Sequence, residues 1–176
     1  MRLASAFRGA AFAAVTLMLG ACINSDYELV SVLTPEFPIK PGTFVKVGAP
    51  NTVITVQREG NAYRAYNSNN KATTYARLYK IPEYPDYVMQ YYDRRKKPIV
   101  YLFLKPTEKG FDIYDIEKLP TSMPEHLTKL IKPVTESDKS DNTINILDGK
   151  RDTLYIVREL LRANLKMFVA ESYERK

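Results

Sequence analysis

Between residues 43 and 116 the chain is a succession of short segments rich in Val, Ile, Thr, Tyr and Phe, each ended by turn residues. Segments of this composition and length favour β-strands. Gly60 and Asn61 form one hairpin signal, because both residues tolerate positive φ, and the turn before Gly110 forms a second. We therefore predict strands at residues 43–47, 52–58, 62–66, 73–81, 87–92, 99–105 and 110–116, preceded by a first strand at 27–33.

The last third of the chain changes to a helical period. Ser122 and Glu125 have the spacing of a capping box, and apolar residues then follow helical spacing until Pro133. A second helix is predicted from residue 152 to about 170, with an apolar stripe formed by Leu154, Val157, Leu161, Leu165 and Phe168. A short strand is expected at 143–147, and residues 171–176 are expected to be a frayed tail. The predicted fold class is α+β, an antiparallel β-meander of hairpins followed by two C-terminal helices.

Length and composition allow one ordinary globular domain. The chain has 176 residues and is 45% hydrophobic, so it can bury a core without disulfides. With one Cys and one His it can form no internal disulfide, and it lacks the ligands of the usual zinc sites. No cofactor or metal is expected.

The N-terminus has the pattern of a secretory signal. Residues 1–21 contain no acidic residue, and Arg2 and Arg8 come before an apolar run that is too short to span a membrane. The run ends at Leu19-Gly20-Ala21-Cys22. This motif resembles the lipobox of bacterial lipoprotein precursors, and the resemblance covers only the first 22 residues.

The resemblance implies cleavage before Cys22 and lipidation of that residue, with palmitate as a typical acyl group. The predicted organisation is a signal peptide at 1–21, a lipidated tether at 22–26 and a single periplasmic α+β domain at 27–176. Two or three acyl chains would anchor the protein stably. Ile23, in place of the Asp that often retains such proteins at the inner membrane, favours the outer membrane, facing the periplasm. The inner membrane and the cell surface remain alternatives, as does a plain secretory signal that leaves a free thiol.

The charge of the chain argues against nucleic-acid binding. The net charge is +6, and it becomes +4 once the signal peptide with its two arginines is removed. The one basic concentration is Arg94-Arg95-Lys96-Lys97. It is either a solvated turn between two strands or a contact with lipid phosphates, lipopolysaccharide or an anionic cell-wall polymer.

The residues do not assemble into a recognisable catalytic motif. His126 is the only imidazole, and the chain lacks the G-x-S-x-G elbow that would accompany a Ser–His–Asp site. It also lacks a P-loop and a G-x-G-x-x-G motif, so nucleotide chemistry has no support. We therefore expect a protein that is not an enzyme.

Tyrosines are concentrated in the strand-rich part, where ten of the thirteen lie between residues 63 and 114. On a strand, Tyr75, Arg77 and Tyr79 would point to one face. A face carrying Tyr and Arg can serve as a binding surface, although the high β-propensity of Tyr explains the same enrichment. The candidate binding surface is therefore Tyr75, Arg77, Tyr79, Arg94, Arg95, Lys96 and Lys97.

Three functions are compatible with these observations. The first is a membrane-anchored lipoprotein with a non-catalytic β-rich domain that binds an envelope protein or an anionic envelope polymer. The second is an accessory subunit of an envelope assembly. The third, and least favoured, is a periplasmic hydrolase acting on cell wall or glycan, because no nucleophile–base pair or metal set can be assembled from the sequence.

Overall fold

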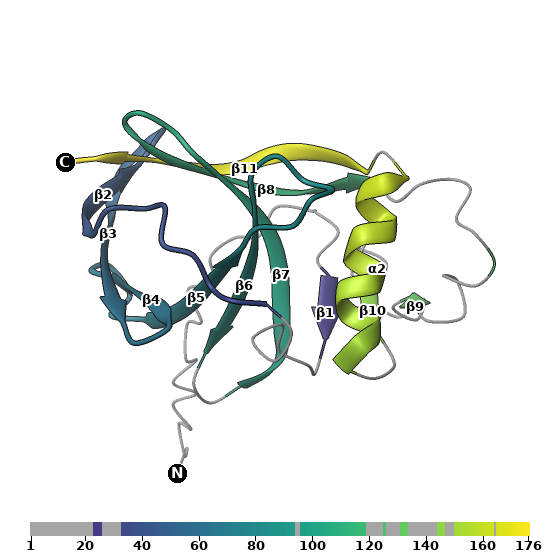
Figure 1. Cartoon of the computed structure of the whole chain (residues 1–176). Coiled ribbons are helices and arrows are strands. Elements are labelled where there is room, and N and C mark those ends of the chain that lie inside the picture. The colour runs from purple at the N-terminus through teal and green to yellow at the C-terminus, as the bar shows by residue number, and fades with distance from the viewer. Residues whose placement is uncertain are drawn as a thin grey trace, which may run out of the picture.

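The computed structural model describes residues 23–25, 33–93, 96–118, 125, 131–133, 144–146, 150–163 and 165–176. Eight strands form a closed antiparallel barrel in the order β2, β3, β4, β5, β6, β7, β8, β11 and back to β2 (Figure 1). Pairing of β6 with β7 completes the ring. The barrel strands are β2 (Gly42–Lys46), β3 (Ala49–Glu59), β4 (Ala62–Asn67), β5 (Thr73–Tyr79), β6 (Tyr87–Asp93), β7 (Lys96–Pro106), β8 (Gly110–Lys118) and β11 (Lys166–Arg175).

Three short strands extend the sheet beyond β7. Strand β7 pairs with β8 only from Phe103 to Pro106, and its earlier half pairs with β1 (Ile23–Ser25) instead. On its other edge β1 pairs in parallel with β10 (Ile144–Ile146), which in turn pairs with β9 (Ile131–Pro133). Helix α2 (Lys150–Arg162) lies beside this extension (Figure 1).

The interior of the barrel is filled by side chains. Successive residues of a strand alternate between the two faces of the sheet, and β7 is buried on both faces. The interior cluster, made by the inward-facing residues, comprises Ile39, Phe44, Val56, Tyr63, Leu78, Met89, Leu102, Leu104, Phe111 and Tyr173. Eight-stranded barrels have an interior of the size that side chains can fill, as here.

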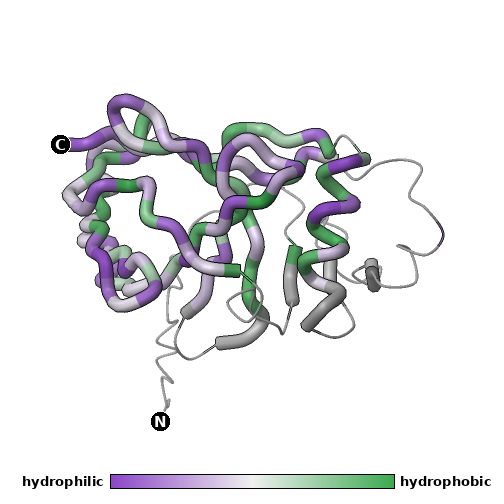
Figure 2. Tube along the Cα trace, viewed as in Figure 1, coloured by the Kyte–Doolittle hydropathy of each residue, from purple (hydrophilic) through white to green (hydrophobic). Residues whose placement is uncertain are grey.

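A second core lies outside the barrel wall, under α2. This outer cluster combines alternate residues of β7 (Ile99, Tyr101 and Phe103) with residues of α2, β1 and the segment after β5. Its helical part is Ile156, Val157 and Leu160, which are all fully buried. In Figure 2 hydrophobic residues follow much of β7, whereas α2 alternates between hydrophobic and hydrophilic residues, as expected for a helix with one face on the core.

Residues 33–41, which we call the plug, run across one mouth of the barrel. The Glu36 N–H donates to the Leu78 carbonyl of β5 at 2.8 Å. The Ile39 N–H donates to the Tyr63 hydroxyl of β4, which donates back to the Ile39 carbonyl, both at 2.8 Å. Arg175 of β11 donates to the Lys40 carbonyl at 2.8 Å. Bonds to three separate strands therefore fix the plug over the mouth.

The predicted α+β class is wrong, because the second predicted helix ends at Arg162 and the chain then turns into β11. Residues 171–176 are not a frayed tail, since β11 pairs with both β8 and β2 and closes the barrel. In the first predicted helix Glu125 is helical, but Ile131 belongs to strand β9 and most of the remainder lies outside the described residues. The strands predicted between 43 and 116 are present with small changes at their ends. Of the first strand predicted, at 27–33, only Leu33 is described, and it lies in a bend.

Candidate binding surface

The outer face of strands β4, β5 and β6 carries a cluster of arginine and tyrosine side chains. Arg64 is opposite Tyr75 in the β4–β5 register, and Tyr75 is opposite Tyr92 in the β5–β6 register, so the three lie in one row across the sheet. Tyr66 lies two residues after Arg64 on β4, and Arg77 lies two residues after Tyr75 on β5, so both are on the same face as the row. We call Arg64, Tyr66, Tyr75, Arg77 and Tyr92 the β4–β6 patch.

Ring contacts hold the centre of the patch in place. The Tyr75 and Tyr92 rings stack with their centroids 5.8 Å apart and an interplanar angle of 24°. The Arg77 Cζ atom lies 4.9 Å from the centroid of the Tyr92 ring. A guanidinium over an aromatic face is attracted by the ring quadrupole and loses part of its rotational freedom. The patch therefore presents a cation whose position is already restricted.

The rim of the patch is open to solvent. The Arg64 side chain is 42% exposed and Tyr66 is 38% exposed. Arg64 Nε is 3.8 Å from the Glu59 carboxylate, which is itself 43% exposed. An ion pair between two exposed groups contributes little, so Glu59 does not prevent Arg64 from meeting another anion.

The structure places the predicted surface residues in two environments. Arg77 is half-buried in the patch, as described above. Tyr75 is 8% exposed and supports Tyr92 from beside it, and Tyr79 is fully buried in the outer cluster. The Tyr79 ring is therefore part of the core, and its replacement would report on folding instead of binding. The sequence does not show this, because the outer cluster that buries Tyr79 includes residues of α2, far along the chain.

Residues 94–97, which we call the basic turn, follow the patch in the sequence. Tyr92 is the penultimate residue of β6, and Asp93 pairs with Lys96 at the start of β7. Lys96 and Lys97 therefore begin β7, and Arg94 and Arg95 lie outside the described residues, as do Cys22 and His126. The described residues on either side of Arg94 and Arg95, namely Asp93 and Lys96, follow Tyr92 at one end of the patch.

Two ion-pair clusters were not foreseen from the sequence. At the barrel mouth opposite the plug, Lys46 of β2 donates to Glu171 of β11 at 2.6 Å, and the Tyr173 hydroxyl donates to the other Glu171 oxygen at 2.9 Å. Burial, together with the Glu171 charge, raises the pKa of Tyr173. Because Tyr173 pairs with Lys46 in the β2–β11 register, this cluster stabilises the junction that closes the barrel.

The second cluster attaches α2 to the barrel. Glu83, in the β5–β6 loop, lies 2.6 Å from Arg158 Nη2 and 2.8 Å from Arg162 Nη2 of α2. The hydrogen bond from Arg158 is the main cause that lowers the pKa of Glu83. Residue spacing could not indicate this contact, because the partners are about 75 positions apart.

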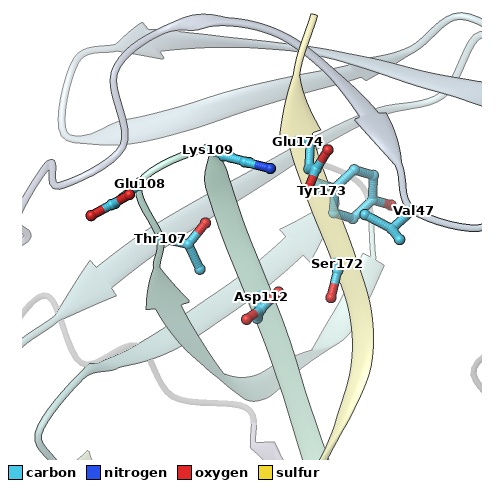
Figure 3. A pocket seen from close by; sticks show the side chains of 8 residues that line it. All are labelled: Val47, Thr107, Glu108, Lys109, Asp112, Ser172, Tyr173 and Glu174. Carbon is cyan, nitrogen blue, oxygen red and sulfur yellow. The ribbon is translucent and has the colours of Figure 1, made fainter.

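A shallow depression of about 480 Å³ lies between the β7–β8 turn, β8 and β11. Figure 3 shows its lining, in which Asp112 and Ser172 are neighbours on β8 and β11 and Lys109 and Glu174 lie above them. The Thr107 hydroxyl is engaged by the Gly110 N–H at 3.0 Å. Six of its eight lining residues have polar or charged aliphatic side chains, none has an imidazole or thiol, and the depression is open to solvent, whereas ligand pockets enclose most of the ligand surface within hydrophobic and aromatic side chains. This depression is therefore a weaker candidate than the β4–β6 patch.

The described residues offer neither a metal-binding cluster nor a membrane-spanning helix. The described part of the chain holds no group of three or more His, Cys, Asp or Glu side chains that could bind a metal ion. Within the same residues, no helix combines the length and the apolar character needed to cross a membrane.

Comparisons with known proteins return no relative. No protein-family model matches the chain, and no curated protein and no solved structure matches it either.

Proposed function

We propose that this chain is a lipid-anchored envelope protein whose non-catalytic barrel binds an anionic envelope polymer through the β4–β6 patch and the basic turn. The observation that carries the proposal is the Arg77 guanidinium over the Tyr92 ring, beside exposed Arg64. Arginine presents planar, forked donors that match carboxylate and phosphate groups. Tyr and Arg are also the residue types that dominate binding hot spots.

The filled interior supports recognition on the outside of the barrel. The ten residues of the interior cluster are at most 7% exposed, so the barrel has side chains where a ligand-binding barrel has a cavity. An extended polymer can contact an outer sheet face along several strands at once. The basic turn would add attraction at a distance, which acts mainly on the rate of encounter and on salt dependence.

The binding experiment uses purified peptidoglycan sacculi, whose peptide carboxylates make them anionic, and cellulose as the neutral polysaccharide control. Arg64→Gln combined with Arg77→Gln should weaken co-sedimentation with sacculi by about tenfold or more, as expected for hot-spot arginines. The matched control is Lys105→Gln with Lys166→Gln, which removes the same charge from exposed positions on β7 and β11. Equal weakening by both double variants would show that binding reflects net charge, and the patch would not be the site.

Two further variants separate the two parts of the surface. Alanine at all four positions 94–97 should weaken binding at low salt and have little effect at high salt, because exposed charges are screened. Arg77→Lys keeps the charge but loses the planar group over Tyr92, so its binding should fall at every salt concentration. Binding by Arg77→Lys equal to that of the wild type would contradict the role of the stacked guanidinium.

The anchor has its own test. Cys22→Ser should abolish palmitate labelling and cause the precursor to accumulate, because the thioether to the lipid can form only on the cysteine sulfur. Unchanged labelling and processing would show that Cys22 is not lipidated. Polymer binding is tested independently by the patch variants.

A further inference from the structure

Strand β1 occupies the place where the sequence predicts the tether. Ile23–Ser25 pairs with Ile99–Tyr101 of β7 on one edge and, through Ile23 and Asn24, with β10 on the other. In the sheet order β1 is the strand between β7 and β10. The ladder from the barrel to the β9–β10 pair therefore runs through β1.

The first residue of β1 is a core residue. Ile23 is 0% exposed and belongs to the outer cluster with Val157 and Leu160 of α2. Burying an isoleucine side chain removes apolar area from water and stabilises the fold, whereas residues of a tether remain solvated. The chain is therefore fixed to the domain at Ile23–Ser25.

Covalent geometry limits the distance between the lipid anchor and the domain. Consecutive Cα atoms are about 3.8 Å apart, so a group attached to Cys22 starts one residue from a fully buried position. If Cys22 carries the lipid, as in the proposed function on which this step rests, the bilayer must come close to the start of β1. We infer that the barrel sits directly on the bilayer surface at the junction of β7 and β10, with no flexible tether between anchor and domain.

This placement also limits the partner. The β4–β6 patch lies one to three strands from β7 around the barrel, and neighbouring strands are about 4.8 Å apart. The patch is thus held within about 15 Å of β7 along the wall. A partner that binds the β4–β6 patch must therefore come close to the membrane surface.

The first test measures folding without the lipid. A soluble domain that begins at Ile23 should unfold at a clearly higher urea concentration than one that begins at Asp26. Ile23→Asp should lower the midpoint as well, and Val47→Asp is the matched control because Val47 is 54% exposed. Equal midpoints for the two soluble domains would mean that residues 23–25 are a tether, and the inference would be overturned.

The second test measures the distance to the bilayer with the lipidated protein in vesicles. Cys22 is the only cysteine and its sulfur would be acylated, so Gln57→Cys provides a single thiol for a fluorescent donor. Gln57 is exposed on β3, which lies opposite β7 in the ring of eight strands. Acceptor dye is placed on the lipid headgroups.

A ten-residue Gly-Ser insertion between Cys22 and Ile23 should reduce energy transfer, because such a linker has a root-mean-square length of roughly 17 Å. The same insertion between Asn69 and Asn70, in the exposed β4–β5 turn, should leave transfer unchanged. Transfer that is insensitive to the insertion before Ile23 would contradict direct contact. A mature chain whose mass shows no acyl group would instead overturn the proposed anchor, so the two failures are distinguishable.

Discussion

At Gly110 strand β8 comes very close to β11. A Cβ atom at this position would lie 1.9 Å from the Tyr173 carbonyl oxygen and 2.9 Å from the carbonyl carbon. These are backbone atoms of a paired strand, so they cannot move aside without disturbing the β8–β11 ladder. The glycine is required by this approach, since its φ is not in the left-handed region.

We expect Gly110→Ala to lower the free energy of unfolding by about 1–3 kcal/mol or more, the usual cost of overpacking. Gly42→Ala is the control, because the nearest atoms to its Cβ belong to the flexible Arg175 guanidinium at 3.4 Å. That variant should change stability by less than about 0.5 kcal/mol. Urea denaturation of the two variants measures the difference, and equal stabilities would show that the strands can separate at little cost.

Tyr63 links the plug to the barrel wall and should respond to alkaline pH. Burial raises the pKa of Tyr63 from 10.0 to about 12, and the backbone hydrogen bond with Ile39 acts in the opposite direction. A folded-state pKa above the unfolded value means that the stabilisation is complete below pH 10. It is then lost as the pH rises through about 12.

Tyr63→Phe should therefore have two effects. At neutral pH it should cost about 1 kcal/mol, because the Ile39 N–H and carbonyl lose their partner. Between pH 10 and 12 its stability should fall less steeply than that of the wild type, because the unfolded chain no longer gains stability from ionising a phenol that stays protonated when buried. The stability of both proteins should still decrease with pH, because burial also raises the pKa values of Tyr84 and Tyr173. Identical slopes for both proteins would contradict the assignment.

At the scale of elements, α2 packs onto the outer face of the barrel wall. Val157 of the predicted stripe is fully buried, and Leu154 and Leu161 are half-buried at its edge. The helix buries Ile156 and Leu160 as well, which the predicted stripe does not contain. The contact face is therefore rotated from the one that the spacing of leucines indicates.

Leu160→Ala should cost about 2–5 kcal/mol, the usual loss for a buried leucine, and Leu161→Ala should cost less than half as much. Tyr155→Ala, at a position 41% exposed, provides the surface control. Thermal unfolding of the three variants at matched conditions orders them. A larger loss at Leu161 than at Leu160 would mean that α2 presents the face predicted from the sequence.

The same comparison explains which elements the sequence could predict. Strands from β2 to β8 are joined by short turns, and their alternation and turn residues are local signals. Strand β11 has irregular register at Lys166/Met167 and at Val169/Glu171, which interrupts the alternation of inward and outward residues. Its inward positions also include Glu171, and Leu165 and Phe168 happen to continue the helical spacing. In the sequence the helical pattern is therefore stronger than the strand pattern beyond Arg162, where the chain in fact forms β11.

At the scale of the whole molecule, closure of the barrel depends on contacts that local sequence cannot reveal. Strand β11 must pair with β2, more than 120 residues earlier in the chain, and α2 must cover the wall that includes Tyr79. The sequence identified Tyr75, Arg77 and Tyr79 as sharing one face of a strand, and they do so. It could not tell which part of this face is covered, because the outer cluster that includes Tyr79 is assembled from segments far apart in the chain, α2 among them.

We propose that the barrel binds through its outer β4–β6 face while its interior remains closed. Amide hydrogen exchange of the folded domain, measured with and without soluble peptidoglycan fragments, tests this claim directly. We expect added protection in β4, β5 and β6 and at the turn after Tyr92, with no change at Ile39 of the plug or in the β2–β11 pair. Protection confined to the plug and the residues around Tyr63, with none on β4–β6, would show that the ligand enters the barrel and would contradict the account.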